Sequence, residues 1–207
     1  AKHSSLFFLL FLLIYSITVA GNLLILLTVG SDSHLSLPMY HFLGHLSFLD
    51  ACLSTVTVPK VMAGLLTLDG KVISFEGCAV QLYCFHFLAS TECFLYTVMA
   101  YDRYTAVCQP LLYVTIITEK ARWGLVTGAY VAGFFSAFVR TVTAFTLSFC
   151  GNNEINFIFC DLPPLLKLSC GDSYTQEVVI IVFALFVMPA CILVILLTSN
   201  QAMTNSS

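Results

Sequence analysis

The dominant pattern in this sequence is a series of long apolar segments separated by shorter polar ones. Five of these segments are long enough to cross a bilayer, which takes about 20 helical residues. Backbone polar groups in lipid must be paired within the segment, so each one is predicted to be an α-helix. The predicted spans are residues 5–29, 39–66, 80–100, 123–145 and 178–198. The polar stretch 146–177 is predicted to be the longest loop.

Composition leads to the same fold class. Of the 207 residues, 59% are hydrophobic and only 9% are charged, whereas about a quarter of the residues of a soluble domain are charged. We therefore expect one all-α membrane domain over residues 1–207, embedded in the lipid bilayer. The net charge of −3 argues against a nucleic-acid partner. The sequence contains no nucleophile–base pair, phosphate-binding loop or metal-ligand spacing, so neither an enzyme nor an organic cofactor is predicted.

Cysteine positions give the orientation. Cys78 opens the third span, and Cys150, Cys160 and Cys170 lie in the 146–177 loop. Cysteines gathered at polar ends on one side are typical of an oxidising compartment, so this side is predicted to face outward. The sequence alone permits three pairings of the four cysteines. A metal site is the rival interpretation, although a spacing of ten residues and a loop without histidine do not favour it.

Two acids lie within predicted spans, Asp50 in the second and Glu92 in the third. A carboxylate inside a membrane is a functional-site hypothesis by default. The pair can bind a hard cation through its oxygens, relay protons, or share a proton because burial favours the neutral acid. In the first span, Asn22 follows Gly21 and is interpreted as a helix-packing residue.

Several short motifs carry a family resemblance. The third span ends in Met-Ala-Tyr-Asp-Arg-Tyr at 99–104, followed by Thr-Ala-Val-Cys-Gln-Pro-Leu, and Pro-Met-Tyr-His-Phe-Leu occupies 38–43. With these motifs the chain resembles the olfactory receptor branch of the rhodopsin-like G protein-coupled receptors. That resemblance implies a rhodopsin-like seven-helix bundle, here truncated to five transmembrane helices because the sequence stops shortly after 198.

The resemblance also implies roles for the charged residues. Asp102, Arg103 and Tyr104 correspond to the switch that couples the receptor to its G protein, with Arg103 paired to Asp102 at rest. Asp50 corresponds to the sodium pocket of rhodopsin-like receptors, and an acid at the position of Glu92 is typical of the olfactory branch. The resemblance thus makes the two acids a candidate sodium site.

Three further features follow from the same resemblance. Cys78 and Cys160 are expected to form the disulfide that ties the third helix to the second extracellular loop. Cys150 and Cys170 are then left for a second bridge. Asn22 is expected to bond toward the second helix.

The ligand pocket is expected on the outer part of the third helix. A largely apolar pocket with one or two polar groups suits a small volatile molecule. Successive residues of a helix do not share a face, so only a subset can point inward. The candidate residues are Tyr83, Phe85, His86, Ala89 and Ser90.

These expectations combine into one functional hypothesis. The chain is predicted to be an odorant-type G protein-coupled receptor, a multi-pass plasma membrane protein with an extracellular N-terminus. Its expected partners are a small, largely apolar odorant and an olfactory-type heterotrimeric G protein. The alternatives are a receptor for a non-odorant small molecule, a non-signalling truncated receptor or pseudogene product, and a small cation channel or transporter built on the two acids.

Overall fold

Four long helices form the body of the molecule. The computed structural model describes residues 2–31, 37–66 and 72–146, together with the isolated positions 155, 156, 160–162, 165, 174, 178, 181, 182, 192 and 196. The four helices long and apolar enough to cross a membrane are α1 (Lys2–Ser31), α2 (Pro38–Leu66), α3 (Phe75–Cys108) and α5 (Glu119–Phe145). The first four predicted spans are thereby confirmed as helices. The fifth, 178–198, lies outside the described residues apart from isolated positions.

Helix α3 is longer at both ends than the predicted span. It begins after Ser74, whose hydroxyl oxygen accepts a hydrogen bond from the Gly77 backbone N–H at 3.1 Å. Such an N-cap satisfies one of the backbone donors that the first turn leaves unpaired. At the other end α3 continues through the charged residues to Cys108 and stops before Pro110, because a proline disfavours helical geometry in the residue before it. Hydropathy locates the apolar centre of this helix but not its polar ends.

A short helix that the sequence analysis did not predict, α4 (Pro110–Ile116), connects α3 to α5. Proline at its first position has the backbone angle that a helix start needs and lacks only an N–H that would be unpaired there. Helix α5 then begins after Thr118, whose side chain accepts from the Ala121 N–H at 3.2 Å. Glu119 in the first turn also complements the positive end of the helix dipole.

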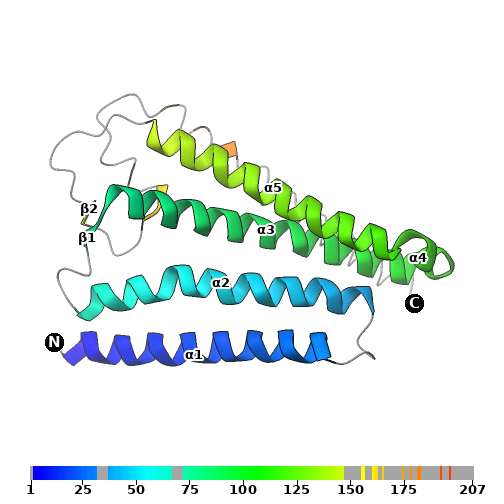
Figure 1. Cartoon of the computed structure of the whole chain (residues 1–207), viewed down its shortest axis with the longest axis horizontal. Helices are drawn as coiled ribbons and strands as arrows, with labels where there is room; N and C mark the ends of the chain where they lie inside the picture. Colours follow the sequence, from blue (N-terminus) through cyan, green and yellow to red (C-terminus); the bar gives the residue numbers. More distant parts are fainter. Residues whose placement is uncertain are drawn as a thin grey trace.

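The long helices pack in the order of the chain (Figure 1). Helix α1 lies against α2, α2 against α3, and α3 against α5. Burial is greatest along α3, which has neighbours on two sides, whereas none of the most apolar window of α1 is buried. One apolar cluster, which includes Phe42, Leu49 and Leu95, joins α2, α3 and α5. The lipid-facing remainder is correspondingly apolar, with exposed side chains such as Leu24 and Phe135.

A small ladder closes the outer end of the molecule. Strand β1 (Val72–Ile73) pairs antiparallel with β2 (Ile155–Asn156) just before α3 begins. A second apolar cluster there combines Cys78 and Leu82 of α3 with Ala144 of α5 and the loop residues Cys160, Leu162 and Leu165. The described part of the 146–177 loop is therefore anchored on the ends of α3 and α5.

The packing role expected of Asn22 is not what the structure shows. Its side-chain amide donates to the Thr18 carbonyl at 3.0 Å, within α1, and a Cβ added at Gly21 would meet nothing within 4 Å. One hydrogen bond between α1 and α2 joins the hydroxyls of Tyr15 and Thr55 at 3.2 Å. An amide one turn from a carbonyl satisfies itself locally and does not need a partner on the next helix.

Candidate functional site

The outer end carries the expected disulfide. Cys78 and Cys160 are bonded, with their Cα atoms 5.3 Å apart and 82 residues between them in the sequence. Both residues are buried. The prediction of this bridge is confirmed, whereas Cys150 and Cys170 lie outside the described residues.

Gln81, one turn below the disulfide, links three segments. Its Nε2 donates to the Val56 carbonyl of α2 at 3.1 Å, and its Oε1 accepts from the Cys160 backbone N–H at 3.2 Å. A buried amide that uses both ends in this way holds loop, α3 and α2 in one register. Gln81 thus supplements the covalent bridge with two directional contacts.

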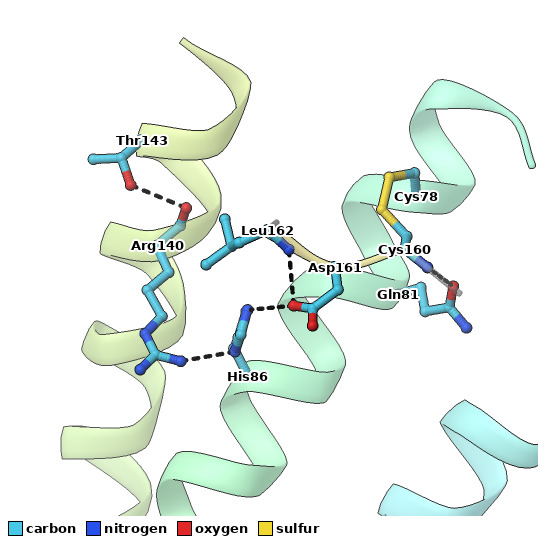
Figure 2. Close-up of polar contacts among 8 residues, drawn as sticks. All are labelled: Cys78, Gln81, His86, Arg140, Thr143, Cys160, Asp161 and Leu162. Atoms are coloured by element: carbon cyan, nitrogen blue, oxygen red, sulfur yellow. Dashed lines mark hydrogen bonds and ion pairs between the residues drawn. A yellow bond between two sulfur atoms is a disulfide. The ribbon is translucent and has the colours of Figure 1, made fainter. Parts of the chain in front are cut away.

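His86 lies at the centre of a polar cluster, further along α3 from the disulfide and Gln81 (Figure 2). Its Nδ1 lies 2.8 Å from Nη1 of Arg140 on α5, and its Nε2 lies 3.9 Å from Oδ1 of Asp161 in the loop. The same Asp161 oxygen accepts the Leu162 backbone N–H at 2.8 Å. His86 is buried, while Asp161 remains 40% exposed. We name these three residues, His86, Arg140 and Asp161, the outer polar cluster.

The other predicted pocket residues are distributed over more than one face of α3. The Tyr83 ring packs edge-on against Phe134 of α5, with ring centroids 6.0 Å apart. The hydroxyl of Ser90 lies 3.3 Å from that of Ser136, also on α5. Phe85 and Ala89 are half-buried. The structure therefore brings Tyr83, His86 and Ser90 against α5, as the helical repeat requires.

A cavity occurs at the opposite end of the bundle. It measures about 380 Å³ and is bordered by α1, α2 and α5. Its polar wall contains His45, whose Nδ1 lies 3.4 Å from the Tyr130 hydroxyl. The residues that line it are Leu26, Val29, Gly30, His41, Gly44, His45, Phe48 and Tyr130. None of the five predicted pocket residues borders this cavity.

The two acids of the spans meet between α2 and α3. Glu92 lies close enough to Asp50 to interact with it electrostatically. The Tyr96 hydroxyl, one turn along α3, donates to Glu92 Oε1 at 3.0 Å. In the part of the chain that the structure describes, no group of three or more His, Cys, Asp or Glu side chains could hold a metal ion. The oxygens of this pair nevertheless suit a hard cation, which needs oxygen ligands only.

The charged pair at the end of α3 divides between two environments. Asp102 is buried and accepts a 2.9 Å hydrogen bond from the Tyr113 hydroxyl of α4, whereas Arg103 is exposed. Within the described residues no ion pair joins Asp102 to Arg103, so the expected pairing is not present in this conformation. The Tyr113 hydroxyl occupies the Asp102 carboxylate instead. Arg122 of α5 also interacts electrostatically with Asp102.

Tyr113 is held in the donor state that this contact needs. Burial and the hydrogen bond to Asp102 raise the pKa of Tyr113 to about 12. The phenol is thus protonated throughout the physiological range and donates to the carboxylate. Helix α4 is tied to α3 by a charge-assisted bond, which is stronger than a neutral one.

Comparison with known proteins identifies the family of this chain. Residues 11–204 match the family model described as olfactory receptor. The chain belongs to the olfactory receptor family. The family resemblance drawn from the motifs is thereby confirmed.

Olfactory receptors of Homo sapiens are among its similar relatives. The chain is 71% identical to olfactory receptor 9Q2 over 191 residues, which cover 92% of the chain and 60% of that protein. It is 67% identical to olfactory receptor 10S1 over 198 residues, or 96% of the chain and 60% of the relative. With olfactory receptor 9Q1 the identity is 60% over 92% of the chain and 61% of the relative. The chain thus spans about 60% of the length of these olfactory receptors.

Sequence reasoning missed several residues of this olfactory receptor chain. Arg140 is the one cation within the predicted span 123–145, and a charge inside an apolar segment is a usable signal for a site. Gln81 and Asp161 have no comparable signal, because their partners come from other segments. Tyr113 was missed together with α4, whose start is marked only by Pro110.

Proposed function

We propose that this chain forms the ligand-sensing part of an odorant-type G protein-coupled receptor in the plasma membrane. It binds small, largely apolar molecules among the outer halves of its helices and signals to an olfactory-type heterotrimeric G protein at the other end. The match to the olfactory receptor family over residues 11–204 carries this proposal.

The two ends of α3 support the orientation. The disulfide and the ladder lie at its Cys78 end, and disulfides persist in oxidising compartments. We therefore place this end and the N-terminus outside the cell. Because α1 and α3 both start on this side, Asp102 and the loop with α4 face the cytosol.

For the cytosolic end, we propose that Asp102, Arg103 and Tyr104 form the coupling switch. Arg103 is exposed at the last turns of α3, while the contact with Tyr113 occupies Asp102. An arginine that is not committed to an ion pair can reach an acceptor on a partner protein through five donors. Tyr104 is half-buried beside it.

Binding and signalling are measured separately to test the receptor proposal. The chain is expressed with an olfactory-type G protein in cells, and cyclic AMP is followed during exposure to small volatile molecules. A response that disappears in Arg103→Ala, while binding in isolated membranes persists, supports the proposal. Binding without any cyclic AMP response in cells that display the chain overturns the signalling part and favours the non-signalling alternative. Sodium current in liposomes without G protein identifies the channel alternative.

For the acids, we propose that Asp50 and Glu92 hold a sodium ion. Two ionised carboxylates in close proximity repel one another, and a shared proton or a bound cation relieves this repulsion. Their oxygens, with the hydroxyl of Tyr96 on Glu92, provide the ligand type that sodium accepts. The rival is a proton shared by the pair.

Sodium-dependent stability distinguishes these two occupants. The melting temperature is measured in NaCl and in N-methylglucamine chloride at equal ionic strength, for the native chain and for Glu92→Gln. The sodium proposal expects NaCl to stabilise the native chain and to lose this effect in the variant. If the melting temperature of the native chain does not depend on sodium but does depend on pH, the pair contains the shared proton instead.

A further inference from the structure

The hydrogen bond from Arg140 fixes the proton of His86. A guanidinium group only donates, and Nη1 of Arg140 lies 2.8 Å from Nδ1 of His86. Nδ1 must therefore accept, which assigns the neutral imidazole with its proton on Nε2. His86 is 6% exposed, and its Nε2 has no hydrogen-bond partner in the described part of the chain. A buried N–H without an acceptor is costly, so this donor indicates an unoccupied acceptor position.

The Nε2–H faces the carboxylate of Asp161 across a gap (Figure 2). The distance from Nε2 to Oδ1 is 3.9 Å, which is too long for a hydrogen bond. Oδ1 accepts the Leu162 N–H, but an ionised carboxylate offers about four acceptor sites. A donor on α3 and an acceptor on the loop thus face each other without meeting.

We propose that a ligand hydroxyl bridges this gap, accepting from His86 and donating to Asp161, so that the chain prefers aliphatic alcohols. This inference rests on the proposed function as an odorant-type receptor. Two hydrogen bonds of roughly 2.8 Å that meet at one oxygen near the tetrahedral angle span roughly 4.6 Å. A shift of less than about 1 Å by the partly exposed Asp161 side chain admits such an oxygen.

Other functional groups satisfy the gap less well. A ketone accepts from Nε2–H but offers nothing to the carboxylate, and an alkane offers no hydrogen-bond partner to either group. A carboxylate ligand would place its charge beside that of Asp161, while the Arg140 cation lies on the far side of the His86 ring. A buried polar site therefore binds most weakly those ligands that leave its donors and acceptors without partners.

A matched series of eight-carbon ligands tests this preference. Binding of 1-octanol, 2-octanone, octane and octanoate to the chain in lipid nanodiscs is titrated by saturation-transfer NMR, with empty nanodiscs correcting for partition into lipid. One hydrogen bond changes affinity by roughly three- to tenfold. We therefore expect 1-octanol to bind more tightly than 2-octanone, and 2-octanone more tightly than octane, by about this factor at each step. Octanoate is expected to bind most weakly.

Two variants locate the effect. His86→Phe keeps a ring of similar size but removes the donor, so the advantage of 1-octanol over octane falls below about twofold, while octane binding is unchanged. Asp161→Asn removes the charge, so octanoate gains affinity and 1-octanol loses some. His45→Phe is the control, because His45 lies at the opposite end of the bundle beside Tyr130, and it leaves the native order intact.

The possible outcomes separate this inference from the receptor proposal. If octane binds as tightly as 1-octanol, or octanoate binds most tightly, the hydroxyl bridge is wrong although the chain is a ligand receptor. If none of the four molecules binds the native chain, the ligand-sensing proposal itself fails for this class of molecule and takes the inference with it. Should His86→Phe fail to fold, the affinity order of the native chain decides alone.

Discussion

Gly133 lies at a close contact between α5 and α3, and substitution there tests the packing of the bundle. A Cβ at this position would overlap the Thr91 hydroxyl and lie 3.0 Å from the Thr91 backbone nitrogen and 3.1 Å from its Cα. Backbone atoms in the middle of a packed helix cannot move away individually. Gly133→Ala must therefore separate the two helices or distort one of them.

The expected cost follows from the kind of contact. Forcing one carbon into a packed interface costs about 1–3 kcal/mol, and the helix-propensity gain of alanine, about 1 kcal/mol at most, offsets part of it. For a chain of this size 1 kcal/mol corresponds to roughly 2–4 °C in melting temperature. Because the overlap involves backbone atoms, the cost lies in the upper part of this range, which leaves a net loss of about 1–2 kcal/mol. We therefore expect Gly133→Ala to lower the melting temperature by about 2–8 °C.

Gly128 supplies the matched control on the same helix. A Cβ there meets nothing within 4 Å, so Gly128→Ala should keep or raise the melting temperature. Unfolding is followed in detergent with a thiol-reactive fluorophore, since the half-buried thiols of Cys52 and Cys84 become accessible when the helices separate. Equal melting temperatures for the two variants would refute the close contact between α3 and α5.

Two further substitutions test the ends of the bundle. Tyr113→Phe removes the donor to the buried Asp102 and should destabilise the chain by about 1–3 kcal/mol. The pKa of Tyr113 is raised to about 12, so the stability difference between the native chain and the variant should be constant around neutral pH. It should shrink only above about pH 10, where an unfolded tyrosine ionises. Melting curves of both chains at several pH values check this, and a difference that vanishes near neutral pH contradicts it. Gln81→Leu removes the contacts with Val56 and Cys160, so dithiothreitol should reduce the Cys78–Cys160 disulfide faster in the variant. Alkylation of the released thiols and a gel shift measure this rate. An unchanged reduction rate would mean that Gln81 does not hold the loop.

Local sequence patterns predicted the parts of the fold that depend on local chemistry. Long apolar runs located four helices, three of them to within four residues at each end, and α2 begins at Pro38. The ends of α3 were missed because caps such as Ser74 depend on one hydrogen bond and not on hydropathy.

The candidate sites were predictable to different degrees. The contact of Asp50 with Glu92 was foreseeable because each acid lies in an apolar span and needs a partner. The outer polar cluster was not, since Asp161 comes from a loop whose path depends on tertiary contacts. The contact of Tyr113 with Asp102, which replaces the expected pairing with Arg103 in this conformation, was not foreseeable because the sequence did not predict α4.

The order of helix packing has a consequence for biosynthesis. Each long helix lies against the one that precedes it in the chain, so every segment that leaves the ribosome can dock on a neighbour already in the bilayer. The Cys78–Cys160 bond cannot form in this way, because its second thiol follows 82 residues after the first. Oxidation must therefore wait until α5 and the loop behind it have been translated. Nascent chains arrested before Cys160 should already contain the packed hairpin of α1 and α2 while Cys78 is still reduced.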